Sequence, residues 1–194
     1  MNEKLNSVLK QVSKPGRYSG GEYGQIIKDK SQVKARFAFC FPDTYEIGMS
    51  NLGMRILYGL MNEMEGVWCE RVFAPWGDME NAMRANNLPL WALESGDPVR
   101  DFDMIAFTIG YEMSYSNILR MLKLSGVPLH AKDREGLHNI VFAGGVCAFN
   151  PEPLADYIDF FSLGEGEEIT PEILNLYDRA KTEEWTKDKF LLEV

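Results

Sequence analysis

Four short segments of this sequence combine glycine with polar side chains in a pattern that suits ligand binding. Their sequences are PDTYEIG at 42–48, GYEMS at 110–114, GGVCA at 144–148 and GEGEE at 164–168. Glycine beside a strand end permits positive φ and lets a ligand approach the backbone closely. No nucleophile with a neighbouring base, and no acid–base pair, can be identified in them. We therefore expect binding rather than catalysis from this chain.

Apolar runs typical of β-strands precede these segments. Strands are predicted at 33–41, 67–73, 103–109, 139–143 and 157–163, with a short extra strand at 89–93. Helical periodicity predicts helices at about 52–64 and 78–86, from Ser114 or Ser116 to Gly126, and after Thr170-Pro171. This alternation predicts an α/β fold, a three-layer sandwich whose mostly parallel five-stranded sheet has the flavodoxin-like order 2-1-3-4-5.

The predicted topology brings the glycine-containing segments together. In an open α/β sheet, a ligand lies outside the carboxyl ends of the strands, where the strand order reverses. Ordinary turn chemistry would explain any one of these loops alone. Their shared position at one edge of the sheet favours a common binding site.

Motifs for several other ligands are incomplete. The segment GEGEEI has Ile169 where a dinucleotide site needs its third glycine, and no P-loop sequence occurs. The third core strand ends in Thr108-Ile109-Gly110, without the aspartate of a phosphoacceptor domain. His130 and His138 fall at the opposite edge of the predicted sheet, so we interpret them as solvated loop residues.

Composition restricts the class of protein further. The 194 residues are 45% hydrophobic and 25% charged, and they carry a formal net charge of −9, which disfavours nucleic-acid binding. Cys40, Cys69 and Cys147 are too widely spaced to predict a structural zinc or iron–sulfur site. No apolar run is long enough for a membrane span, and we expect a cytoplasmic protein.

The segment from 144 to 167 resembles a signature of radical SAM proteins that carry an N-terminal cobalamin-binding domain. It contains Gly144-Gly145, then NPEPL at 150–154, Asp159 and GEGE at 164–167. The stretches KPGRYSGGEY at 14–23 and FCFPDTYEIGMSNLG at 39–53 are similar to one subgroup of that family. The resemblance implies a cobalamin-binding-domain-like fold, with the corrinoid over the carboxyl ends of the strands and its nucleotide tail in a slot beside the first strand and the last helix.

The same resemblance implies a set of cofactor-binding residues. They are Asp43, Thr44, Tyr45, Gly48, Thr108, Ser114, Gly144, Gly145, Gly164, Glu165 and Gly166. Carriers with a protein ligand to cobalt use the motif D-x-H-x-x-G, whereas this sequence has Tyr45 in the histidine position. A phenol with a pKa near about 10 is a poor cobalt ligand, so bound cobalamin is expected to lack histidine ligation.

A radical SAM cluster also needs C-x-x-x-C-x-x-C, which these residues do not supply. The [4Fe–4S] cluster and S-adenosylmethionine are therefore expected in a downstream radical SAM domain of a longer protein, which would be the partner of this one. We predict an N-terminal helix and strap at 1–30, the cobalamin-binding-like domain at 31–182, and the start of a linker at 183–194. The alternative is a degenerate fold of this type that serves as a docking domain without corrinoid.

Overall fold

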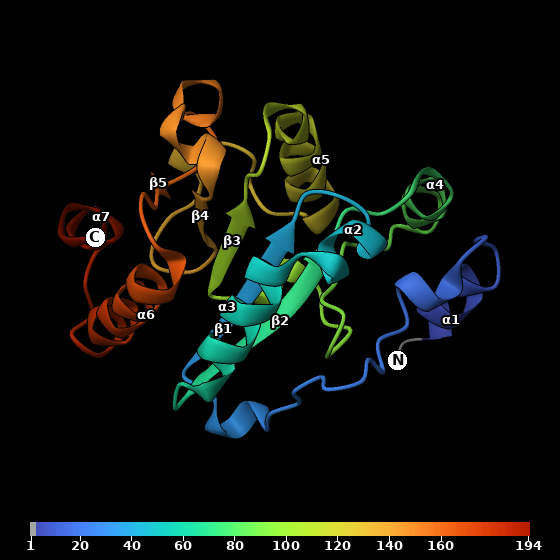
Figure 1. Cartoon of the computed structure of the whole chain (residues 1–194), viewed down its shortest axis with the longest axis horizontal. Coiled ribbons are helices and arrows are strands. Elements are labelled where there is room, and N and C mark those ends of the chain that lie inside the picture. The colour runs from blue at the N-terminus through green and yellow to red at the C-terminus, as the bar shows by residue number, and fades with distance from the viewer. Residues whose placement is uncertain (1–2) are drawn as a thin grey trace.

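The computed structural model describes residues 3–194, so Met1 and Asn2 of the predicted N-terminal segment lie outside the described residues. Within this range, five parallel strands form one sheet in the order β2-β1-β3-β4-β5 (Figure 1). The strands are β1 (Ala35–Phe41), β2 (Val67–Phe73), β3 (Met104–Thr108), β4 (Ile140–Gly144) and β5 (Phe160–Phe161). The predicted flavodoxin-like α/β arrangement is confirmed.

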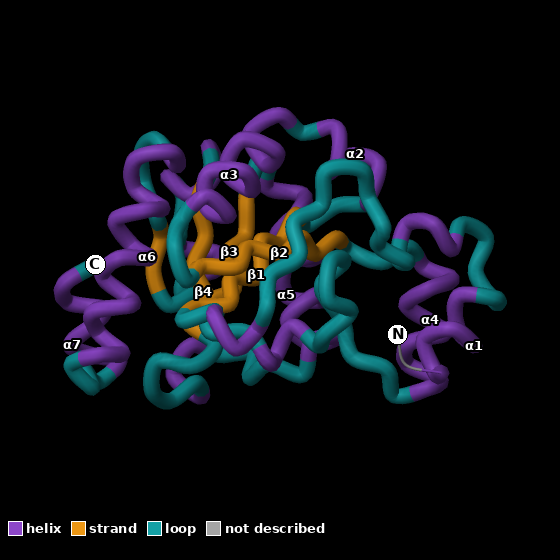
Figure 2. The backbone as a smooth tube through the Cα atoms, turned by 90° about the horizontal axis from the view of Figure 1, so that it is seen from below, coloured by secondary structure: helices purple, strands orange, loops and turns teal. Residues whose placement is uncertain are grey.

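Helices cover both faces of the sheet, which Figure 2 shows almost end-on. One face carries α3 (Leu52–Glu63), α6 (Gly166–Thr182) and α7 (Lys187–Glu193). The other carries α4 (Gly77–Asn86) and α5 (Tyr115–Ser125), with α1 (Glu3–Leu9) packed on α4. Short 3₁₀ turns occur at Pro15–Arg17, Lys30–Gln32, Val99–Asp101, Glu112–Ser114, Ala131–Asp133, Val146–Phe149 and Glu152–Leu154. In the described part of the chain, no helix has the length and apolar character needed to span a bilayer.

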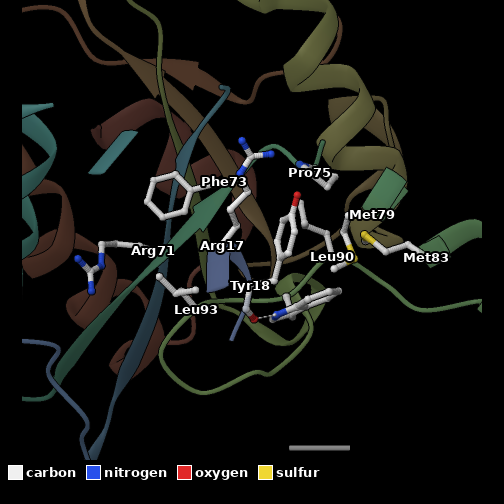
Figure 3. Close-up of a pocket in the computed structure, with 10 residues that line it drawn as sticks. Arg17, Tyr18, Arg71, Phe73, Pro75, Met79, Met83, Leu90 and Leu93 are labelled. Carbon is white, nitrogen blue, oxygen red and sulfur yellow. Dashed lines mark hydrogen bonds between the residues drawn. The ribbon is translucent and has the colours of Figure 1, made fainter. Parts of the chain in front are cut away.

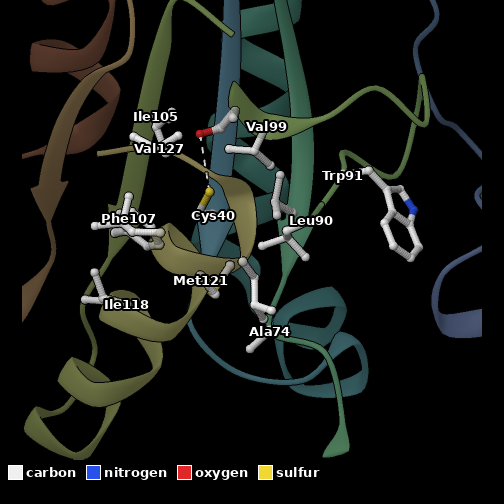
Figure 4. Packing of buried hydrophobic residues seen from close by; sticks show 14 of the residues in the cluster. Cys40, Ala74, Leu90, Trp91, Val99, Ile105, Phe107, Ile118, Met121 and Val127 are labelled. Carbon is white, nitrogen blue, oxygen red and sulfur yellow. Dashed lines mark hydrogen bonds between the residues drawn. The ribbon is translucent and has the colours of Figure 1, made fainter. Parts of the chain in front are cut away.

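Alternating strand residues fill the two cores. On the α4–α5 face, Cys40, Ile105 and Phe107 of the strands pack against Ile118 and Met121 of α5 (Figure 4). All five are almost fully buried. Burial of this apolar area is the main source of stability for such a domain, and it fixes the faces of β1 and β3 that remain for a site.

β2 is an edge strand, yet every one of its residues is buried. The loop after α4 covers it: the Leu93 backbone N–H donates to the Arg71 carbonyl, and the Glu94 carboxylate accepts from the Arg71 side chain at 2.6 Å. This covering explains why the short strand predicted at 89–93 is wrong. The segment closes the edge as a loop whose one ladder contact is an isolated bridge between Trp91 and Pro98.

Two helix boundaries also differ from the prediction. A short helix, α2 (Tyr45–Ser50), occupies part of the loop expected after the first strand. The last long helix begins at Gly166, and Pro171 lies inside it. Proline removes only one hydrogen bond there, to the carbonyl of Glu167, an exposed residue in the first turn, so the helix tolerates it.

Residues 13–34, called the strap below, connect α1 to β1 across the outside of the sheet (Figure 1). Arg17 pairs with Glu46 of α2 at 2.8 Å. The Glu22 carboxylate accepts from the Tyr45 hydroxyl at 2.6 Å, and the Tyr18 hydroxyl accepts from the Trp76 backbone N–H. The strap therefore fixes α2 and the loop after β2 against the rest of the domain.

Candidate functional site

A cavity of about 150 Å³ lies between α3 and α6 and reaches the edge of the sheet where the strands end, the carboxyl edge. Its floor is formed by the apolar side chains Phe37, Phe39 and Phe142 of the sheet. Leu57 and Met61 of α3 form one wall. Such an apolar floor suits a flat, largely apolar group. This space is called the carboxyl-edge cavity below.

Glycines line the mouth of the carboxyl-edge cavity. They are Gly53 at the start of α3, Gly144 and Gly145 after β4, Gly164 after β5, and Gly166 at the start of α6. A Cβ on Gly144 would lie in ordinary contact, 3.6 Å from the Ser162 carbonyl oxygen, so the missing side chain leaves the mouth open without being required by the fold.

Gly145 is different, because the backbone itself needs a glycine there. It has φ +101°, and a Cβ would lie 2.8 Å from the Ile109 carbonyl oxygen. The loops after β3 and β4 are tied closely at this point, since the Ile109 N–H donates to the Gly144 carbonyl at 2.7 Å and the Cys147 N–H donates to the Ile109 carbonyl.

Three hydroxyl groups give the cavity its polar character. Thr108, Ser162 and Thr170 line it, and within residues 3–194 none of their side chains has a hydrogen-bond partner. Thr170 is only 7% exposed. Thr108 and Ser162 are half-buried, and a hydroxyl can both donate and accept, so these groups are available to bind the polar atoms of a ligand or water.

The loops after β1 and β3 meet at the carboxyl edge of the sheet. The Asp43 carboxylate accepts from the Thr44 backbone N–H at 2.6 Å and from the Tyr111 hydroxyl at 3.0 Å. The hydrogen bond to Asp43 raises the pKa of Tyr111, so this phenol stays neutral at physiological pH. β1 and β3 are the strands between which the sheet order reverses, so this bridge lies at the switch point of the fold.

Tyr45 has other surroundings. Its hydroxyl donates to Glu22 of the strap, and its ring packs edge-on against Phe73 of β2, with centroids 5.5 Å apart. Burial and the Glu22 carboxylate raise its pKa to about 12. Gly48, one turn further along α2, packs so closely on Phe73 that a Cβ would clash with the ring. Tyr45 and Gly48 thus hold α2 in place.

The structure brings together five of the residues expected at the site. Thr108, Gly144, Gly145, Gly164 and Gly166 line the carboxyl-edge cavity. Asp43 and Thr44 instead line a neighbouring hollow of about 370 Å³ with Trp76 and Arg120. Ser114 is buried, with its hydroxyl donating to the Tyr111 carbonyl, and Glu165 is exposed at the N-cap of α6.

Sequence reasoning missed Ser162 and Thr170. Ser162 stands two residues before Gly164, and Thr170 stands four residues after Gly166, on the same face of α6. A search for hydroxyl side chains at helical or strand spacing from the turn glycines would have found both.

A larger hollow of about 500 Å³ lies beside Lys132, Arg134 and Lys187, and none of the glycines of the carboxyl-edge cavity lines it. The hollow shown in Figure 3, between the strap and α4, measures only about 20 Å³ and is filled by packing of Tyr18 against the apolar side chains around it. No group of three or more His, Cys, Asp or Glu side chains in residues 3–194 is arranged to hold a metal ion.

Comparison with known proteins identifies the family of this chain. A model described as the N-terminal region of radical SAM proteins matches residues 53–194. An uncharacterised protein of Methanocaldococcus jannaschii is 25% identical over 142 residues, covering 71% of this chain and 26% of that protein. The chain thus spans about a quarter of the length of this relative. No solved structure matches the chain.

Proposed function

Since this chain belongs to the N-terminal family of radical SAM proteins, we propose that it is a module that binds cobalamin, without histidine ligation, for a radical SAM domain of the same polypeptide. The observation that carries this proposal is the carboxyl-edge cavity, which opens between glycines beside the switch point of the sheet. A bound corrinoid would supply a methyl group or a radical partner for chemistry performed in the other domain.

The residues of the cavity suit the nucleotide tail of the cofactor. The aromatic floor of Phe37, Phe39 and Phe142 matches a flat heterocyclic base. The free hydroxyls of Thr108, Ser162 and Thr170 can donate to ring nitrogens or ribose oxygens. These hydroxyls make no hydrogen bond within residues 3–194, so each is available to a polar atom of the ligand.

A direct test measures whether the chain retains cobalamin. The purified chain is mixed with hydroxocobalamin, desalted and examined by visible spectroscopy, and the dissociation constant is taken from a titration. Gly144→Leu places an isobutyl group at the cavity mouth, where the backbone tolerates a side chain. We expect the dissociation constant to rise at least about tenfold, because the ligand must displace that group.

The matched control is Gly59→Leu. Gly59 lies in α3, nothing is within 4 Å of its ideal Cβ, and it does not line the carboxyl-edge cavity. This variant should bind as the wild type does. A colourless wild-type protein after desalting, or equal affinity of the two leucine variants, would contradict the proposal.

One observation favours the alternative, a docking domain without corrinoid. Met113, Val146 and Phe149 are exposed apolar side chains in the loops after β3 and β4, and apolar patches of this kind commonly mark interaction sites. A protein that retains no corrinoid but binds its own radical SAM domain in trans would favour this second function.

We also propose that the iron–sulfur cluster and S-adenosylmethionine bind in that other domain. Residues 3–194 contain no cluster of side chains suited to metal binding, and the match to the relative covers only 26% of the latter's length. Iron analysis and S-adenosylmethionine binding, compared between this chain and a longer protein that includes the radical SAM domain, test this assignment.

A further inference from the structure

Two tyrosines are candidates for the side chain that lies beside the proposed ligand. Sequence spacing assigns Tyr45 to the histidine position of the motif D-x-H-x-x-G. The structure offers a second phenol, Tyr111, which reaches the aspartate of the same motif from the loop after β3. The surroundings of the two side chains decide between them.

Tyr45 is directed toward the outer edge of the sheet. Its hydroxyl is held by Glu22 of the strap and its ring by Phe73 of the edge strand β2. The ring contact therefore lies on the β2 side of β1. A ligand at the switch point lies on the other side, between β1 and β3.

Tyr111 lies at that switch point. Its hydrogen bond to Asp43 joins the loops after β3 and β1, and the side chain is 46% exposed. Thr108, three residues earlier, lines the carboxyl-edge cavity, and the Ile109 N–H is tied to Gly144 at the cavity mouth. Tyr111 itself does not line the cavity, but it follows these two residues closely along the chain.

Building on the cobalamin binding proposed above, we infer that Tyr111, positioned by Asp43, is the side chain that faces the underside of the corrin ring, in place of the absent histidine. Its hydroxyl donates to the Asp43 carboxylate, so it presents a neutral oxygen. Tyr111 contacts the face of the ligand and gives the cobalt no strong nitrogen ligand, and Asp43 is the residue that positions it.

Two histidine substitutions test this placement. Tyr111→His puts an imidazole beside Asp43, which can accept from one ring nitrogen and leave the other for the metal. Tyr45→His is the matched control, because the sequence motif predicts that it should be the ligating variant. Both proteins are loaded with cobalamin, reduced to cob(II)alamin and examined by electron paramagnetic resonance, in which a ligating nitrogen splits the cobalt lines.

Heavy-nitrogen histidine identifies the source of any splitting. The pattern changes on labelling only if the nitrogen belongs to the protein, which separates the imidazole from the nucleotide base of the cofactor. We expect label-dependent splitting in Tyr111→His alone, with the wild type and Tyr45→His unaffected. Label-dependent splitting in Tyr45→His, or in neither variant, would overturn the inference.

Tyr111→Phe provides a measurement that does not require a new ligand. It keeps the ring but loses the bond to Asp43, and we expect the dissociation constant for cobalamin to rise about threefold to tenfold. An unchanged constant contradicts the inference even when the wild type binds. Failure of the wild type to retain cobalamin contradicts the proposed function itself, and the inference falls with it.

Discussion

Replacing Asp159 by alanine is expected to destabilise this domain more than most single substitutions. The carboxylate is fully buried just before β5 and accepts from Arg134 at 3.0 Å and from the Val141 backbone N–H at 2.7 Å. Lys187 of α7 approaches its other oxygen at 2.6 Å. Asp159→Ala removes the one anion in this cluster and leaves the Arg134 side chain, only 1% exposed, without a counter-charge.

The size of this loss of stability depends on the hydrogen bonds that Arg134 retains. Removing one partner of a buried ion pair typically costs about 3–5 kcal/mol. Arg134 keeps hydrogen bonds to the Pro128, Leu129 and Tyr157 carbonyls, which favours the lower end, about 3 kcal/mol. For a domain of this size, that corresponds to a decrease in Tm of about 6–12 °C.

Urea unfolding followed by circular dichroism measures this loss. Asp178→Ala is the matched control, because Asp178 pairs with Lys34 at 3.4 Å on the exposed surface, and its loss should cost below about 1 kcal/mol. The double variant Arg134→Met/Asp159→Leu should lose less unfolding free energy than Arg134→Met and Asp159→Leu lose in sum. Neither charge of the ion pair then remains without its partner. Equal costs for Asp159→Ala and Asp178→Ala would refute the reasoning.

Two further predictions concern the strap contact and the turn after β4. Tyrosine titrates near pH 10 in an unfolded chain, whereas burial and Glu22 raise the pKa of Tyr45 to about 12. The unfolded state therefore loses its proton first, and the contribution of Tyr45 to stability is full below pH 10 and falls as the pH rises to about 12. Tyr45→Phe should show a smaller loss of stability over that pH range in urea titrations, and an identical loss would contradict the raised pKa. Gly145→Ala should cost about 1–3 kcal/mol, because it combines positive φ with a contact of 2.8 Å to Ile109. Gly136→Ala, with φ +67° and open space around the Cβ, should cost less, and equal unfolding free energies for the two variants would exclude a role for the contact.

The sequence was sufficient to predict the sheet because each core strand is a compact apolar run. The run at 104–107 is buried on both faces, and its pairing with β1 and β4 follows from the alternation of strands and helices. β5 is shorter than predicted, at two residues, since only Phe160 and Phe161 pair with β4.

The candidate site could be predicted only in part. Glycines at strand ends identify where the backbone turns, so Gly144, Gly145 and Gly164 were found from the sequence. Which polar side chains face the cavity depends on how α3 and α6 are set against the sheet. The surroundings of Tyr45 could not be predicted either. Motif spacing gives its position in the loop, but its hydrogen-bond partner Glu22 belongs to the strap, 23 residues earlier in the chain.

β5 is short, and it stands between the buried ion pair of Asp159 and the turn that lines the carboxyl-edge cavity. Two ladder residues and one hydrogen bond, from the Ser162 N–H to the Ala143 carbonyl at 2.8 Å, hold the turn 162–166, which contributes Ser162, Gly164 and Gly166 to the cavity. Asp159 stands directly before β5, and its bonds to Arg134 and to the Val141 N–H fix the start of the strand to β4. The cluster thus supplies the rigidity that a longer strand would give, and a cavity wall needs such rigidity for tight binding. If cobalamin binds as proposed, Asp159→Ala should weaken its retention under conditions where the variant is still folded, whereas Asp178→Ala should not.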